Sequence, residues 1–179
     1  MRVFNLSGTA AMAIGCVTLF GACAAAGANM AQNEQTVSSV DLNKYLGKWH
    51  EIARYPNSFQ KTCFKSTATY SLRDDGDIKV VNACRKDRPD GGEKTIEGKA
   101  WVVDKATNAK LRVRFFWPFW GSYWIIDLGK DYEYAVVGNP DRDYCWILSR
   151  TPTMDDKVFE GIAERLKTKG YDPAKLIRQ

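Results

Sequence analysis

Residues able to carry out covalent or metal chemistry are few in this sequence. The chain has one histidine, His50, and beyond its first 28 residues the cysteines are Cys63, Cys84 and Cys145. A nucleophilic cysteine needs a neighbouring base or another cause of a depressed pKa. The sequence contains no metal-ligand cluster, no nucleophile elbow and no glycine-rich phosphate loop. We therefore expect a protein that is not an enzyme and that needs neither metal nor cofactor.

Aromatic side chains are the most unusual feature of the chain. The segment VRFFWPFWGSYWII, residues 113–126, carries seven aromatics in fourteen residues. A transmembrane helix needs about 20 predominantly apolar residues. This run is interrupted or bounded by Arg112, Arg114, Pro118, Gly121 and Asp127. The run must therefore serve another purpose, which depends on the elements that carry it.

The first 28 residues have the features of a secretory signal. A basic start at Arg2 precedes an apolar stretch over 10–20 and small residues over 22–28. Two cleavage sites fit this segment. Residues 26–28 (AGA) suit ordinary processing and secretion, whereas residues 19–23 (LFGAC) resemble a bacterial lipoprotein box that would make Cys23 the lipidated first residue. We favour cleavage before Cys23, which predicts a lipid anchor in the outer membrane facing the periplasm.

The rest of the chain is expected to form one domain. Residues 29–40 are polar and lack periodicity, which predicts a tether, and the domain then covers residues 41–179. The formal net charge of +5 falls to +4 when the signal and Arg2 are removed. Lysine and arginine form no cluster, so we expect no nucleic-acid partner. The oligomeric state is left open.

Short alternating segments separated by turns dominate the domain. The clearest is a hairpin, in which residues 64–72 and 78–80 flank the turn Arg73-Asp74-Asp75-Gly76. Further strands are expected over 48–55, 95–103, 110–116, 122–128, 133–137 and 144–149. Eight strands at these intervals are typical of a sandwich or of an up-and-down barrel.

A helix is expected after the last strand. Thr153 is a suitable N-cap, and Gly170 stands where a helix would end. Between them lies an apolar stripe formed by Val158, Phe159, Ile162, Ala163 and Leu166. The stripe must be buried, so we expect the helix to pack on the outside of a closed sheet.

Particular residues in these elements resemble the lipocalin family. Gly47-Lys48-Trp49 at the first strand is similar to the family's G-x-W signature, Asp131-Tyr132 to its second region and Arg150 to its third. The segments "GKWHEIARYP", "TATYSLRDDG", "GNPDRDY" and "WILSRTP" are similar to the bacterial outer-membrane lipocalins, relatives of apolipoprotein D. The resemblance covers nearly all of residues 41–179. His50 departs from it, because an aromatic usually follows this tryptophan.

The resemblance implies an all-β fold: an eight-stranded up-and-down antiparallel β-barrel, the lipocalin calyx, with one C-terminal α-helix packed outside. Trp49 would plug the narrow end and the Arg150 guanidinium would stack on its ring. Gly47, Asp131 and Tyr132 would complete this closed end. By strict alternation His50 would face away from the calyx and could not activate Cys145 there.

The aromatic run then falls at the open end of the barrel. Residues 117–121 would form the loop between the fifth and sixth strands. The residues expected to bind ligand in the calyx or at its mouth are Tyr70, Val113, Phe115, Trp117, Trp120, Tyr123 and Ile125. For Phe115 and Ile125, mutual packing is an equal alternative. For Trp117 and Trp120 we favour a rim that touches ligand or membrane.

Three features remain open in the sequence. Cys63 and Cys84 fall near each other at the open rim, about two residues off direct opposition, so a disulfide would need a bulge or flexible strand ends; two free thiols are the alternative. Cys145 suits a small buried hydrophobe. Glu51 and Arg54 fit either a buried ion pair or a contact with a ligand carboxylate.

The function implied by the resemblance is binding, storage or transport of fatty acids or lysophospholipids in the bacterial envelope, for membrane maintenance. Two alternatives belong to other classes. One is a structural or partner-binding envelope protein with a filled barrel, and the other is a calyx enzyme that uses Cys145.

Overall fold

The computed structural model describes residues 35–179, so the signal, Cys23 and residues 29–34 of the tether lie outside the described residues. Its strands are β1 Gly47–Arg54, β2 Cys63–Leu72, β3 Ile78–Lys86, β4 Glu93–Val102, β5 Lys110–Phe116, β6 Phe119–Leu128, β7 Tyr134–Gly138, β8 Cys145–Ser149 and β9 Ile177–Arg178. The helices are α2 Leu42–Tyr45 and α3 Asp156–Thr168, with the 3-10 turns η1 Ser58–Gln60 and η2 Pro173–Lys175.

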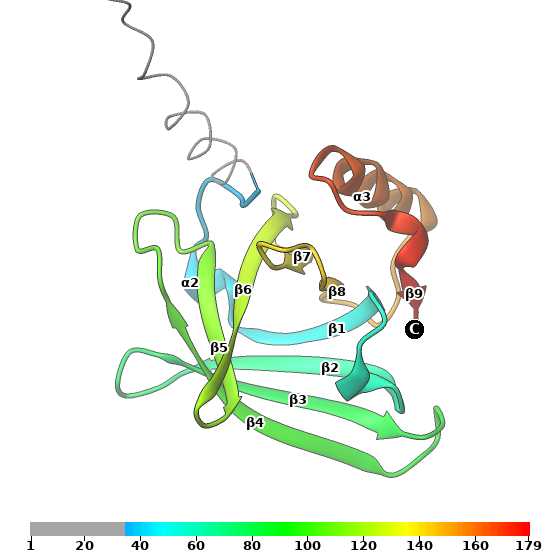
Figure 1. Ribbon diagram of the computed structural model, residues 1–179, viewed down its shortest axis with the longest axis horizontal. Coiled ribbons are helices and arrows are strands. Elements are labelled where there is room, and N and C mark those ends of the chain that lie inside the picture. The colour runs from blue at the N-terminus through cyan, green and yellow to red at the C-terminus, as the bar shows by residue number, and fades with distance from the viewer. Residues whose placement is uncertain (1–34) are drawn as a thin grey trace, which may run out of the picture.

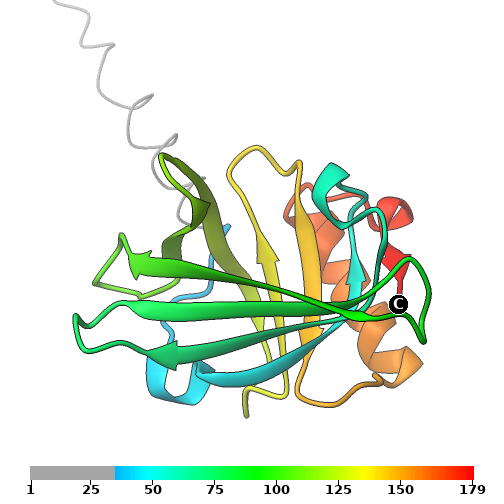
Figure 2. The same ribbon diagram turned by 90° about the horizontal axis from the view of Figure 1, so that it is seen from below.

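Strands β1 to β8 form a closed antiparallel barrel (Figure 1). Each strand pairs with the next, and β1 closes the ring by pairing with both β2 and β8. The expected eight-stranded up-and-down barrel is thereby confirmed. Beyond the part of β1 that pairs with β2, the short strand β9 pairs with Ala53 and Arg54. This pairing places the C-terminus beside the barrel (Figure 2).

The hairpin between β2 and β3 shows why the strands turn where they do. Arg73 donates its backbone N–H to the carbonyl of Asp77, and Gly76 adopts a φ of +81°. A positive φ is unfavourable for residues with a Cβ, and glycine adopts it freely. Regular alternation then resumes at Ile78, whose partner across the turn is Leu72.

Helix α3 packs on the outside of the barrel, as expected. Ile162 and Leu166 are fully buried against an outer core that includes Ile126, Val136 and Ile147. Two details of the expectation were wrong. The N-cap is Asp155, whose carboxylate accepts from the Lys157 backbone N–H, and not Thr153. Val158 is exposed rather than part of the buried stripe.

The connection between β5 and β6 is shorter than the expected five-residue loop. Phe116 pairs with Phe119, so only Trp117 and Pro118 separate the two strands. The aromatic residues extend the hairpin because their side chains suit a pleated, half-buried surface. The result is a projecting aromatic tip rather than an open loop.

The chain that enters the barrel is packed against its closed end. Val37 and Val40 donate their backbone N–H groups to the carbonyls of Ile125 and Thr107, and Val40 is buried. The part of the expected tether that the structure describes, residues 35–40, therefore lies against the barrel instead of extending into solvent. Helix α2, which the sequence analysis missed, follows it. Among residues 35–179, no helix is long and apolar enough to cross a membrane.

Candidate functional site

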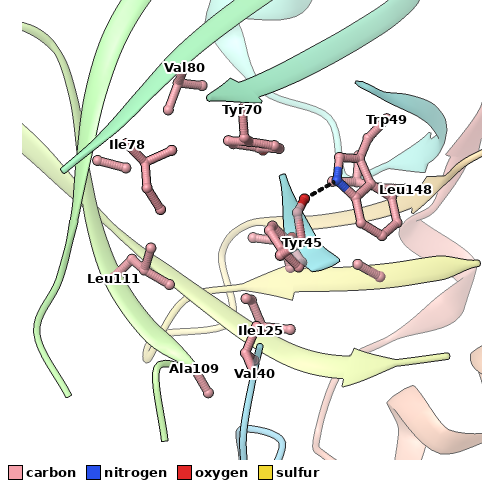
Figure 3. Packing of buried hydrophobic residues seen from close by; sticks show 13 residues of the cluster. Val40, Tyr45, Trp49, Tyr70, Ile78, Val80, Ala109, Leu111, Ile125 and Leu148 are labelled. Carbon is pink, nitrogen blue, oxygen red and sulfur yellow. Dashed lines mark hydrogen bonds between the residues drawn. The ribbon is translucent and has the colours of Figure 1, made fainter. Parts of the chain in front are cut away.

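The closed end of the barrel is sealed by Trp49. Its ring is fully buried, and its Nε1–H donates to the Tyr45 carbonyl at 2.8 Å (Figure 3). The Arg150 guanidinium lies 3.7 Å from the centroid of the Trp49 ring. That guanidinium also donates to the carbonyls of Lys44 at 2.6 Å, Lys48 at 3.0 Å and Tyr132 at 3.3 Å. One arginine thus joins the segment before β1 to the turn before β7.

The other residues expected at this end have distinct positions. Gly47 adopts a φ of +95°, and a Cβ there would lie 3.3 Å from Nη1 of Arg150, so glycine lets the guanidinium approach. The Tyr132 hydroxyl accepts from the Asp41 backbone N–H at 2.8 Å. Asp131 is exposed, and its backbone N–H donates to the Glu133 carboxylate. Among the described residues, its side chain makes no hydrogen bond or ion pair with Trp49 or Arg150.

Above Trp49, the lower half of the interior is filled. Figure 3 shows side chains from α2 and several strands pointing toward one another, among them Tyr45, Tyr70, Leu111 and Ile125. The Tyr123 hydroxyl joins those of Tyr45 and Tyr70 through hydrogen bonds of 2.7 and 2.8 Å. Burial raises the pKa of all three phenols, so they remain neutral at physiological pH. These tyrosines form a polar floor within an apolar core.

The upper half of the interior is more open. Most inward-facing side chains at the lower level are buried, whereas several apolar and polar ones nearer the open end keep intermediate exposure: Ala68, Asn82, Ile96, Val113, Phe115 and Trp146. A Cβ on Gly98 would lie 2.6 Å from a ring carbon of Phe115. Glycine at this position therefore lets the Phe115 ring pack closely against β4.

A buried ion pair lies on the β1 side of the interior. Glu51 Oε1 accepts from Arg54 Nη1 at 2.8 Å, and Glu51 Oε2 accepts from Gln60 Nε2 at 2.8 Å. Gln60 Oε1 in turn accepts from the Trp146 indole N–H at 2.9 Å. Burial raises the pKa of Glu51, and the contacts with Arg54 and Gln60 oppose this rise. Of the two interpretations that the sequence left open for Glu51 and Arg54, the ion pair is present.

The structure brings five of the seven expected ligand residues together inside the barrel: Tyr70, Val113, Phe115, Tyr123 and Ile125. The other two lie at the β5–β6 tip. Trp117 is 81% exposed, and the half-exposed Trp120 ring lies 3.8 Å from the Arg112 guanidinium. Arg112 neighbours the inward-facing Leu111 and Val113, so it faces outward. Trp117 and Trp120 therefore do not join the interior group.

The expected disulfide between Cys63 and Cys84 is confirmed, with a Cα–Cα distance of 5.3 Å. Cys63 pairs across the ladder with Lys86, so Cys84 is two residues from direct opposition. A bulge between Phe64 and Thr67 accommodates this offset. The bond ties β2 to β3 at the open end.

Cys145 does not lie in the calyx. It is fully buried in the outer core beneath α3, and burial raises its pKa to about 12. The hypothesis of a calyx enzyme that uses Cys145 is therefore wrong, because the thiol points away from the calyx and stays protonated. His50 pairs with Thr67 and Ser149 on the outer face. Residues 35–179 contain no group of three or more residues arranged to hold a metal ion.

Sequence reasoning missed several interior residues. Tyr45 reaches the floor from the short helix α2, which no periodicity reveals. Gln60 reaches the ion pair from η1, a turn outside any strand. Asn82 faces the interior at an alternating strand position, and the same alternation that identified Tyr70 would have identified it. Ser66 is buried within the bulge between Phe64 and Thr67, where alternation gives no guide.

Comparison with known proteins agrees with this architecture. Residues 40–179 match the lipocalin-like domain. The outer membrane lipoprotein Blc of Escherichia coli K12 is 46% identical over 142 residues, which are 79% of each chain. Blc of Vibrio cholerae is 40% identical over 163 residues, 90% of this chain and 92% of that one. Apolipoprotein D of Bos taurus is 36% identical over 146 residues, 76% and 74% of the two chains.

Among solved structures, insecticyanin from the tobacco hornworm Manduca sexta is similar with a TM-score of 0.65. Its sequence is 24% identical, and the match covers 81% of this chain and 82% of that chain. This likeness supports the fold alone. The match over residues 40–179 and the identity to these relatives show that the chain belongs to the lipocalin family.

Proposed function

We propose that this lipocalin binds and stores or transports small amphipathic lipids, fatty acids or lysophospholipids, in its calyx. The observation that carries the proposal is the contrast between the two halves of the interior. The lower half is sealed by Trp49 and the buried core, whereas inward-facing side chains such as Val113 and Phe115 keep intermediate exposure toward the open end. Such a blind, largely apolar interior suits one small ligand.

The driving force would be burial of the acyl chain. Each CH₂ removed from water contributes about 0.8 kcal/mol. The charged part of a lipid would stay at the mouth, where Lys61, in the connection after β1, and Lys86, at the end of β3, are exposed. Affinity should therefore rise with chain length until the upper half of the calyx is filled.

We also propose that the protein is held at the outer membrane, facing the periplasm, through a lipidated Cys23, and serves membrane maintenance there. Support comes from the relatives named outer membrane lipoprotein and from the lipoprotein-like segment at residues 19–23. A single acyl chain anchors only marginally, so several chains on Cys23 would be needed for firm attachment. Palmitate labelling that disappears in Cys23→Ser would support the anchor, and unchanged labelling would refute it.

The first experiment is native mass spectrometry with lipid extraction on the protein purified from bacterial cells. A co-purified fatty acid or lysophospholipid, together with saturable quenching of tryptophan fluorescence by added lipid, is the expected result. A lipid-free mass and flat titrations with both lipid classes would refute the proposal.

A second candidate function rests on the aromatic tip, defined as Phe116, Trp117, Phe119 and Trp120. All four side chains are more than half exposed, and clustered exposed apolar residues often mark interaction sites. A partner-binding envelope protein would use this tip. Replacing Trp117 and Trp120 with serine should then abolish partner capture while leaving the lipid titration unchanged.

A further inference from the structure

The outer face of β5 carries three cations. Lys110, Arg112 and Arg114 occupy alternate positions of the strand. The residues between them, Leu111 and Val113, pack in the interior core, so the cations point away from the calyx. All three side chains keep intermediate exposure and can therefore be reached from solvent.

Tryptophans of the neighbouring strands β4 and β6 flank these cations. Each cation lies within cation–π distance of one ring centroid: Lys110 4.9 Å from that of Trp124, Arg112 3.8 Å from that of Trp120, and Arg114 5.9 Å from that of Trp101. These six residues are here called the basic-aromatic face. Indole rings and cations gathered on the outside of a barrel, and not in its core, indicate a surface that meets a partner.

The basic-aromatic face has unpaired positive charge. Among the described residues, neither Arg112 nor Arg114 forms an ion pair. Glu97 lies two residues from the position on β4 that pairs with Arg114, and its carboxylate is already paired with Lys79 at 2.7 Å. Residues 105–126 contain four cations and no acidic residue. Two guanidinium groups are therefore available to bind an anion.

The basic-aromatic face continues into the aromatic tip. Trp120 belongs to both groups, and Trp117 is the most exposed ring of the tip. Successive strands of the barrel alternate in direction, so the connection between β5 and β6 lies at the end opposite Trp49. The tip therefore projects beside the mouth of the calyx.

A partner that fits both groups is negatively charged at its surface and apolar beneath it. Arginine binds phosphate oxygens bidentately, and tryptophan is enriched at membrane–water interfaces. The headgroup layer of an anionic bilayer supplies phosphates to Arg112 and Arg114 and an apolar region to the tip. An acidic protein surface satisfies the arginines but leaves the exposed rings of the tip in water.

The length of chain before the described residues permits this contact. Gln35, the first described residue, is twelve residues after the proposed anchor at Cys23. A fully extended chain of this length spans about 40 Å. Strand β6, with 10 residues, spans about 33 Å. An anchored protein can therefore bring its open end to the membrane that holds Cys23.

We infer that the basic-aromatic face and the aromatic tip together form a docking surface for an anionic lipid bilayer. Arg112 and Arg114 bind lipid phosphates, and Trp117 and Trp120 lie in the headgroup region. The inference goes beyond the proposed function, because this membrane contact uses neither Cys23 nor the interior of the calyx. Docking in this orientation turns the mouth of the calyx toward the bilayer.

The test is co-sedimentation of the chain from Ala24 onward, which lacks the signal and Cys23, with two kinds of vesicle. One contains phosphatidylglycerol and phosphatidylcholine, and the other contains phosphatidylcholine alone. The native sequence should bind the anionic vesicles about tenfold or more tightly, and its tryptophan emission should shift to shorter wavelength on binding. Arg112→Gln/Arg114→Gln should weaken binding to the anionic vesicles about tenfold or more. Trp117→Ser/Trp120→Ser should abolish the emission shift.

Lys130→Gln/Lys157→Gln is the matched control. It removes two exposed lysines, one from the turn after β6 and one from α3, and changes the net charge by the same amount. This variant should bind the anionic vesicles like the native sequence. Equal losses in the two charge variants would overturn the docking surface, as would a native protein that binds neither vesicle. Capture of a protein by the tip without vesicle binding would overturn it too.

A titration with a lysophospholipid below its micelle concentration separates the docking surface from the calyx. Arg112→Gln/Arg114→Gln should keep the native quenching curve, because both arginines face outward. Loss of vesicle binding with this curve unchanged supports a separate surface. A native protein that binds anionic vesicles but gives a flat titration would refute the lipid-binding calyx and leave the docking surface standing. Urea unfolding of each variant checks that its barrel is intact.

Discussion

Replacing Arg150 with alanine is expected to destabilise the barrel by about 2–4 kcal/mol. A cation–π contact such as that between Arg150 and Trp49 contributes about 0.5–2 kcal/mol, depending on burial. The same guanidinium donates to three backbone carbonyls. Hydrogen bonds involving a charged group contribute about 1.5–3 kcal/mol each. Water can replace part of these bonds, because the site is partly exposed, so the sum is well below full additivity.

The assay is urea unfolding followed by tryptophan fluorescence and far-UV circular dichroism. A loss in this range corresponds to a fall in Tm of roughly 6–16 °C for a domain of this size. Arg150→Lys should lie between the native protein and Arg150→Ala, because an ammonium keeps the charge but lacks the planar fork that reaches several carbonyls.

Arg112→Ala is the matched control for this experiment. Its guanidinium lies at nearly the same distance, 3.8 Å, from the half-exposed ring of Trp120. The described residues give it no carbonyl acceptors comparable to those of Arg150. The expected loss is therefore below about 1 kcal/mol. Equal effects of the two replacements, or a loss under about 1 kcal/mol for Arg150→Ala, would refute the view that this arginine ties the closed end together.

Three other outcomes are expected. Reducing the Cys63–Cys84 disulfide, whose cysteines are 21 residues apart, should lower the free energy of unfolding by about 3 kcal/mol; urea curves that coincide with and without dithiothreitol would contradict this. Cys145, buried and with a pKa of about 12, should resist iodoacetamide at pH 8 until the protein unfolds, as mass spectrometry can show. Burial and Lys48 lower the pKa of His50, so the unfolded chain binds this proton more tightly and stability should fall as pH drops below about 6.5. Urea unfolding of His50→Gln should lack this part of the pH dependence, and an NMR titration that places the pKa above 6.5 would exclude it.

Much of the barrel could be predicted from the sequence because its strands alternate regularly. The hairpin around Gly76 and the apolar face of β5 follow directly from side-chain periodicity and turn chemistry. Ile162 and Leu166 could likewise be assigned to the buried face of a helix, since their spacing matches the helical period. The exact connection between β5 and β6 could not be predicted, because the aromatic residues there suit either a strand or a loop.

The interior of the upper calyx was harder to predict because it depends on a break in that regularity. Strict alternation from Trp49 would place Glu51 and Ala53 inside the barrel and Arg54 outside. The register instead shifts between Glu51 and Ala53, so Ala53 joins the outer core beneath α3 while Arg54 turns inward. Strand β1 thus contributes residues to the inner core, to the outer core beneath α3 and, with Arg54, a buried cation to the calyx. Side-chain periodicity in the sequence does not predict this bulge, because the bulge forms only when β1 pairs with β8. The buried cation of the calyx is therefore a property of the closed barrel, because Arg54 faces inward only through one irregular pairing that local sequence patterns do not encode.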